Sequence, residues 1–246
     1  MYKVFLGWAR GAPEDRKPKL IDIGCCSKHR PTSHEIGKYL RLLVGTELRS
    51  ALYDGYPSDQ LAPNLIGCDL RTEFIQYGHE LYQDGPTSDK PAAIAFFQSD
   101  LFDEGSALAS MKGKINYIHT AAVFHLFDKS TQQEMAERLL DLLNVPERAD
   151  NEAGFKARGG EYIMFGSHDG REQEQVLKDR YGDTRYAHSP TSWIKMWNAI
   201  LVKKYGEEWV KLRVKQDAYL GKVYEFPEKP DYPTYRDLVW SVHITV

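Results

Sequence analysis

Leu20-Ile21-Asp22-Ile23-Gly24-Cys25-Cys26 is a short apolar run that carries one acid and breaks at a glycine. This pattern is typical of a buried parallel strand that leads into a ligand-binding turn. Two runs of the same kind follow at 64–70 and 93–102, and each reaches an Asp-Leu pair near its end. Three strand ends with acids in this order favour a site for an adenosine-containing cofactor.

Composition limits the kinds of protein that this sequence can encode. The 246 residues are 42% apolar, which is enough for one large α/β core, so we expect a single domain over 1–246. The net charge of -3 is spread along the chain and indicates no nucleic-acid partner. The longest apolar run, at 92–97, is far shorter than the roughly 18 residues of a membrane helix.

The N-terminal sequence and the cysteines indicate a compartment. Residues 1–8 lack the apolar core and cleavage site of a signal peptide, so we expect an intracellular, cytoplasmic protein. Three cysteines, two of them adjacent, suit reduced thiols better than disulfides.

Strand-like runs alternate with segments of helical periodicity. We expect helices over 36–52 after a capping box at 32–35, over 71–83, over 130–143 with a capping box at 130–133, and from Ser189-Pro190 onward. Further strands are expected at 115–119 and 161–165, and a closing antiparallel pair at 209–214 and 238–246. The order predicts an α/β fold with a doubly wound, mostly parallel, seven-stranded sheet and an antiparallel C-terminal edge.

The candidate binding residues all lie at strand ends, where a doubly wound sheet binds its ligand. Gly24 lets the backbone approach a ligand closely, and Asp22 is placed to fix the loop or to meet a cationic group through water. Asp69 suits a ribose diol, and Asp100 suits an adenine amino group. The apolar residues that would pack on the purine are Leu70 and Leu101. The competing interpretation is that Asp22 and Asp69 only cap loops.

The glycine turn distinguishes between adenosine cofactors. A dinucleotide site needs G-x-G-x-x-G so that the pyrophosphate can sit against bare backbone, whereas 24–29 holds one glycine. S-adenosylmethionine has no phosphate, and its methionine part tolerates small residues such as Cys25 and Cys26.

Four segments carry a resemblance to a known family. Residues 21–26, 67–74, 118–128 and 238–243 resemble the class I S-adenosylmethionine-dependent methyltransferases of fungal secondary metabolism, above all those of meroterpenoid pathways. The resemblance covers nearly the whole chain. It implies that 69–70 and 100–101 contact the cofactor, and that residues after the fourth strand, beginning with Ala121, face the methionine and the methyl acceptor.

Two departures from that family lie near the N-terminus. Asp69 follows Asp22 by 47 positions, whereas the family spacing is about 20. We therefore expect an insertion at about 27–44, together with a shortened N-terminal segment. A truncated or misannotated gene product that includes a translated intron would explain the two departures.

Methyl transfer requires alignment of the acceptor, the methyl group and the sulfur, and in some cases removal of a proton. His125, just past the fourth strand, is the best-placed base; alternatively it bonds to backbone at a helix start, or only orients a carboxylate acceptor. We expect His119 to be structural. We expect His168 in a loop after the fifth strand, from which it can also reach the pocket, although loop histidines are usually solvated. The tryptophans at 193 and 197 suit a core, and no cysteine–histidine cluster predicts a metal.

The resulting hypothesis is S-adenosylmethionine-dependent O-methylation, on a hydroxyl or a carboxyl group, of a small natural product. The alternatives are a related protein that has lost methyl transfer or catalyses a cyclisation, a nicotinamide-dependent oxidoreductase, and a non-enzymatic binding protein. The single glycine and the missing Tyr-x-x-x-Lys pair disfavour the oxidoreductase. The acceptor would be a small molecule, and the sequence does not indicate an oligomeric state.

Overall fold

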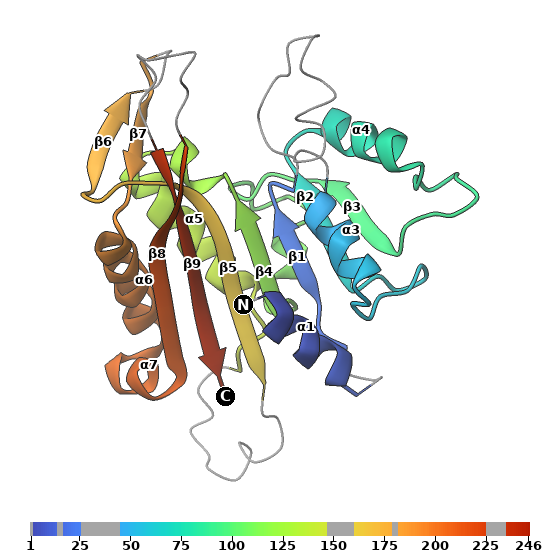
Figure 1. Ribbon diagram of the computed structural model, residues 1–246. Coiled ribbons are helices and arrows are strands. Elements are labelled where there is room, and N and C mark those ends of the chain that lie inside the picture. Colours follow the sequence, from blue (N-terminus) through green and yellow to red (C-terminus); the bar gives the residue numbers. More distant parts are fainter. Residues whose placement is uncertain (1, 14–16, 26–44, 147–159, 179–181, 225–234) are drawn as a thin grey trace. The chain divides into compact units, whose positions relative to one another are not determined.

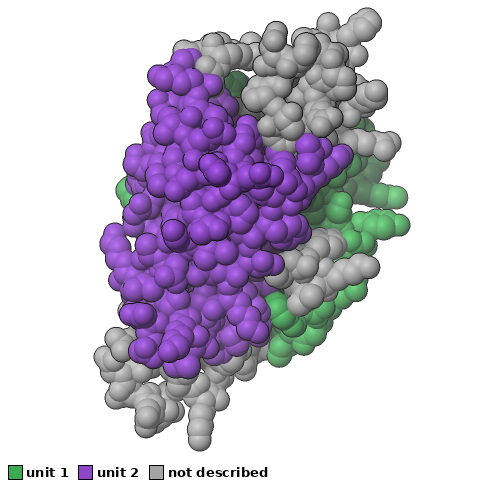
Figure 2. All heavy atoms as spheres, turned by 60° about the vertical axis from the view of Figure 1, so that its left-hand side comes forward, with its two compact units in different colours: residues 1–120 green, residues 121–246 purple. Residues whose placement is uncertain are grey.

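The computed structural model describes residues 2–13, 17–25, 45–146, 160–178, 182–224 and 235–246 (Figure 1). Cys26, the expected insertion at 27–44 and the expected capping box at 32–35 lie outside these residues. The chain divides into two compact units, residues 1–120 and 121–246 (Figure 2).

The central element is a seven-stranded sheet with the strand order β3-β2-β1-β4-β5-β9-β8. Its strands are β1 (Leu20–Ile23), β2 (Leu65–Asp69), β3 (Ile94–Gln98), β4 (Tyr117–Ala121), β5 (Glu161–Gly170), β8 (Val214–Tyr224) and β9 (Tyr235–Thr245). β1, β2, β3 and β4 pair in parallel, while β9 runs antiparallel to both β5 and β8. The predicted doubly wound, mostly parallel sheet is therefore confirmed, with its antiparallel strand second from the edge.

Unit 1 combines the first four strands with short helices. The helices are α1 (Tyr2–Gly11), α3 (Thr46–Tyr53), α4 (Thr72–Tyr82) and the 3-10 turn η3 (Ala109–Met111). Every residue of β1 and β2 is buried, as expected for near-continuous apolar strands in the middle of a parallel sheet. The predicted helices at 36–52 and 71–83 correspond in their described parts to α3 and α4.

Close packing in unit 1 depends on Gly67, in the middle of β2. A Cβ atom at this position would lie 2.4 Å from Cδ1 of Phe96 and 3.0 Å from Cδ1 of Leu48. The Arg49 guanidinium stacks 4.8 Å from the Phe96 ring centroid and forms two hydrogen bonds with Asp84, at 2.6 and 2.8 Å. These contacts hold α3 against β2, β3 and the end of α4.

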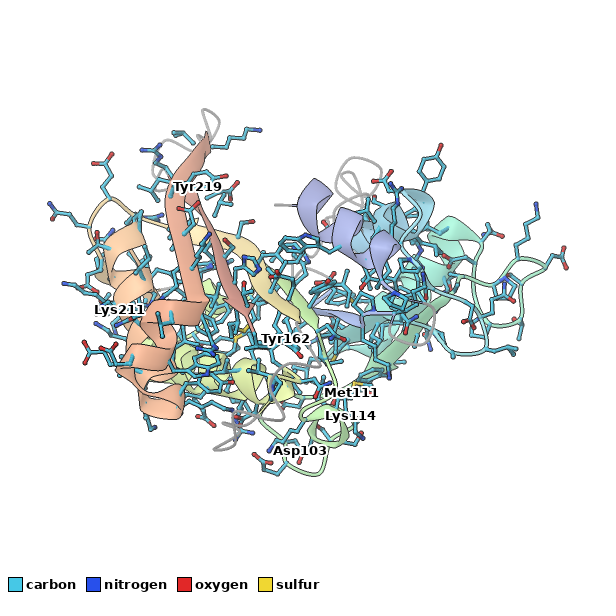
Figure 3. The ribbon with its side chains drawn as sticks, turned by 90° about the horizontal axis from the view of Figure 1, so that it is seen from below. Asp103, Met111, Lys114, Tyr162, Lys211 and Tyr219 are labelled. Carbon is cyan, nitrogen blue, oxygen red and sulfur yellow. The ribbon has the colours of Figure 1, made fainter. Side chains whose placement is uncertain are left out.

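Unit 2 contains longer strands and the larger helices. Its helices are the 3-10 turn η4 (Phe124–Leu126), α5 (Lys129–Leu142), α6 (Pro190–Tyr205) and α7 (Glu207–Arg213). It also contains a separate hairpin of β6 (Gln175–Lys178) and β7 (Thr184–Ala187). Ser189 caps α6 in a capping box, which confirms the predicted helix start. Lys211 of α7 and Tyr219 of β8 are exposed (Figure 3).

Three expectations for unit 2 were wrong. β5 continues to Gly170 because it pairs with β9 along its whole length, so 166–170 is strand and not loop. Residues 209–213 belong to α7, so the closing antiparallel pair is β8 with β9. The N-cap of α5 is Asp128, whose side chain accepts a hydrogen bond from the Thr131 amide, in place of the predicted box at 130–133.

Candidate functional site

The end of β1 carries a buried ion pair with β4. The Asp22 and His119 Cα atoms are partners across the two strands, and Asp22 Oδ1 lies 2.9 Å from His119 Nδ1. The side chains are 3% and 15% exposed. Burial acts to lower the pKa of His119, but the negative charges of Asp22 and Glu47 outweigh it and raise that pKa above its usual value.

The glycine turn follows directly. Gly24 has φ 71°, a left-handed conformation that glycine adopts without a Cβ penalty. The amides of Gly24 and Cys25 both donate to the Cys68 carbonyl, at 2.8 and 3.1 Å, and the Gly45 amide donates to the Cys25 carbonyl at 2.9 Å. The turn is thereby tied to β2 and to the start of α3.

The ends of β2 and β3 present the other two acids. Asp69 is 6% exposed and accepts a hydrogen bond from the Arg71 amide at 2.9 Å, while its carbonyl accepts one from the Ser99 amide. Asp100 is exposed and accepts from the Phe102 amide at 2.8 Å. Both carboxylates thus shape their own loops, and Asp100 is open to solvent. For Asp69 this agrees with the capping interpretation, whereas Asp22 pairs with His119 of another strand.

The apolar residues next to these acids differ in exposure. Leu70 is 58% exposed, and Leu101 is half-buried. A large exposed apolar side chain next to a strand-end acid is suited to pack against the flat face of a purine ring.

His125 lies on η4 in unit 2. Its Nδ1 accepts a long hydrogen bond, 3.4 Å, from the Asp169 amide. A neutral imidazole that accepts at Nδ1 carries its proton on Nε2. Ala121 ends β4, and the next residue, Ala122, has φ 55° and donates its amide to the Ser167 carbonyl at 2.7 Å.

His168 is buried, at 3% exposure, and the expectation of a solvated loop residue was wrong. Its ring lies 4.5 Å from that of Trp193 and 5.7 Å from that of Phe124. Neither ring nitrogen has a hydrogen-bond partner among the described residues. Burial, and then the nearby His125 and His188, hold the pKa of His168 well below its usual value.

His188 shares this environment. Its Nδ1 lies 2.9 Å from the Ser192 hydroxyl, and burial is the main cause that lowers its pKa to about 4. Trp193 packs beside His188 and Trp197 packs against Trp193, and both are fully buried, which agrees with the prediction that they form core.

Sequence reasoning missed two members of the β1 site. It treated His119 as structural but did not identify it as the partner of Asp22, and it did not single out Glu47. A polar residue inside the apolar strand 115–119 was the available signal for His119. Within the ranges that the structure describes, no group of three acidic, histidine or cysteine residues is arranged to hold a metal ion, and no helix is long and apolar enough to cross a membrane.

Comparison with known proteins finds relatives in fungi. No family model matches the chain. The O-methyltransferase phiE of a fungal species is 33% identical over 211 residues, 82% of this chain and 55% of that protein. Methyltransferase adrK of Penicillium rubens is 29% identical over 208 residues, 83% of this chain and 60% of that protein. The chain therefore spans between half and two thirds of the length of these relatives.

Among solved structures, the YcgJ protein from Bacillus subtilis superposes with a TM-score of 0.52. The alignment covers 98% of this chain and 96% of that protein at 9% identity. At this identity the likeness concerns the fold alone.

Proposed function

We propose that this chain, a relative of the fungal secondary-metabolite methyltransferases with the class I methyltransferase fold, binds S-adenosylmethionine and methylates an oxygen atom of a small natural product. The observation that carries the proposal is the arrangement of Asp22, Asp69 and Asp100 at or just beyond the carboxyl ends of β1, β2 and β3. In doubly wound sheets, ligands bind at that edge, where the strand order reverses.

Each strand end then has a distinct role. Asp69 accepts hydrogen bonds from the ribose hydroxyls, and Asp100 accepts one from the adenine amino group. Leu70 and Leu101 pack on the purine. The remaining proposed cofactor contacts are Asp22, Gly24, Cys26 and Ala121, of which Cys26 lies outside the described residues.

The turn at Gly24 supports S-adenosylmethionine over a dinucleotide. Its two amides already donate to the Cys68 carbonyl, so they do not point outward as a phosphate cradle does. A cofactor without phosphate loses nothing by this arrangement.

The tautomer of His125 determines which kind of methyl-acceptor group this side chain can assist. In the tautomer whose Nδ1 accepts from the Asp169 amide, the proton is on Nε2, and this tautomer would suit an acceptor oxygen that is already ionised. A carboxylate acceptor fits this donor directly. A hydroxyl acceptor requires the other tautomer, in which the Asp169 contact is lost and Nε2 acts as the base.

Calorimetry with S-adenosylhomocysteine and with NAD tests the cofactor assignment. We expect binding of S-adenosylhomocysteine alone, and Asp69→Ala should weaken it by about 1–3 kcal/mol through lost charge-assisted hydrogen bonds. Asp103→Ala is a matched control, since Asp103 also caps its own loop, accepting from the Gly105 amide at 2.8 Å, but lies further from the strand end. Tight NAD binding, or equal losses in both variants, would contradict the proposal.

A further inference from the structure

The pair formed by Asp22 and His119 lies where the sheet changes direction. From β1 the chain continues outward to β2 and β3, and then returns to place β4 on the other side of β1. The point of reversal is therefore between β1 and β4, and the Asp22–His119 hydrogen bond bridges these two strands. Ligands of doubly wound sheets bind beyond this point.

We propose that His119 is a positioning residue that distinguishes S-adenosylmethionine from S-adenosylhomocysteine, because it orients the Asp22 carboxylate at the strand reversal and releases a proton when the cationic cofactor binds. The inference rests on the proposed function and adds to it a means of telling substrate from product.

The charges around His119 support this role. Two negatively charged groups that act on it are Asp22 of β1 and Glu47 of α3. Burial lowers the pKa of His119, and the two carboxylates together raise it above the ordinary value of 6.5. His119 therefore carries its proton over a larger part of the neutral pH range than an ordinary histidine does.

The two ligands differ by one positive charge. S-adenosylmethionine carries a sulfonium and has a net charge of +1, whereas the thioether product is neutral overall. A unit charge about 8 Å away, at an effective dielectric constant of about 20, shifts a pKa by about 1.5 units. A bound sulfonium would thus lower the pKa of His119, the proton would pass to the buffer, and the charge of Asp22 would no longer be balanced by His119.

The direction of the pH dependence follows. Because binding releases a proton, the affinity for S-adenosylmethionine should rise as the pH increases through the pKa of His119 in the unliganded protein. Affinity for the neutral product should change less. After methyl transfer the sulfonium is lost, His119 takes up a proton again, and the site no longer favours the ligand that it holds.

Calorimetry on the full chain, in phosphate and in Tris at the same pH, measures the number of protons released. We expect S-adenosylmethionine to release more protons than S-adenosylhomocysteine, and the ratio of their Kd values to shift by about tenfold toward S-adenosylmethionine between pH 5.5 and 8. His119→Gln still offers Asp22 a hydrogen-bond donor but does not titrate, so it should bind both ligands with equal proton release.

The chain offers a matched control in a second histidine–aspartate pair of unit 1. His79 Nδ1 lies 3.0 Å from Asp84 Oδ1, away from the strand reversal, and His79→Gln should leave the proton release unchanged. Glu47→Gln should reduce the difference between the two ligands without abolishing it.

The outcomes separate this inference from the proposed function. If neither ligand binds, the proposed function fails and the inference with it. If both bind with equal proton release in the unmodified protein, the inference alone is overturned, and this measurement requires no variant to fold. A difference that survives in His119→Gln, or that disappears in His79→Gln, also overturns it.

Discussion

Replacement of His168 by phenylalanine should stabilise the protein and make it more resistant to acid. Both ring nitrogens of His168 are buried and unpartnered among the described residues, and each such group costs about 1–3 kcal/mol. The tilted Trp193 ring, 4.5 Å away, offsets part of this cost. We therefore expect a net gain of about 1–3 kcal/mol in the free energy of unfolding at pH 7.5.

Acidification should widen the difference in free energy of unfolding between His168→Phe and the unmodified protein. The pKa of His168 in the folded protein is well below the unfolded value of 6.5, so below pH 6.5 the unfolded chain binds a proton that the folded chain does not. Stability is then lost as the pH falls, at about 1.4 kcal/mol per pH unit, or about 2 kcal/mol between pH 6.5 and 5. His188 acts in the same direction and remains in the variant, which should therefore retain part of the pH dependence.

Urea unfolding followed by tryptophan fluorescence measures both effects, because Trp193, Trp197 and Trp240 pack around this site. His168→Leu repeats the test with a smaller side chain, in case the phenylalanine ring is too large. If the variants are less stable at pH 7.5, or the gap between variant and unmodified protein does not widen at pH 5, the reasoning about a neutral, unpartnered imidazole is refuted.

Three other predictions concern packing, an ion pair and catalysis. Gly67→Ala should lower the free energy of unfolding by about 1–3 kcal/mol in urea titrations, because its Cβ would lie 2.4 Å from a Phe96 ring carbon; an unchanged midpoint would show that the ring moves aside at no cost. Asp84→Asn should cost about 1–3 kcal/mol at pH 7. Although burial opposes it, Arg49 and His79 lower the pKa of Asp84 below 3.8, so the measured cost should shrink as the pH falls toward that value; a loss that is constant with pH would argue against the ion pair. Steady-state assays of His125→Ala should show a kcat loss of about a hundredfold or more with a hydroxyl acceptor, but mainly a higher KM with a carboxylate. Equal kinetics in the variant and the unmodified protein would remove His125 from the site.

The parallel half of the sheet could be predicted because each of its strands can be recognised from its own short stretch of sequence. Buried runs such as 20–23 and 65–69 are apolar enough to be recognised alone, and each is followed by a helix with clear periodicity. The strand-end residues Asp69 and Asp100 followed from the same pattern.

The second half of β5 could not be predicted in this way. Residues 166–170 contain two glycines, a serine and an aspartate, which locally favour a turn. They become strand because β9, about seventy positions later, supplies a continuous antiparallel partner. His168 lies in this part of β5 and is buried.

The partnership of Asp22 with His119 was hidden for a related reason. The two residues are 97 positions apart, and only the register between β1 and β4 makes them neighbours. A single sequence carries no signal of register between distant strands, so His119 was noticed but its partner Asp22 was not identified.

Ala122 has a consequence for how a ligand meets this protein. A non-glycine residue at φ 55° carries a conformational penalty of about 1–2 kcal/mol and persists only where its surroundings determine it, here through its 2.7 Å hydrogen bond to the Ser167 carbonyl. The backbone leading to His125 is thus already held in one shape before any ligand arrives. A molecule that contacts this segment does not have to restrict it further, so the conformational entropy lost on binding is smaller than for a flexible loop.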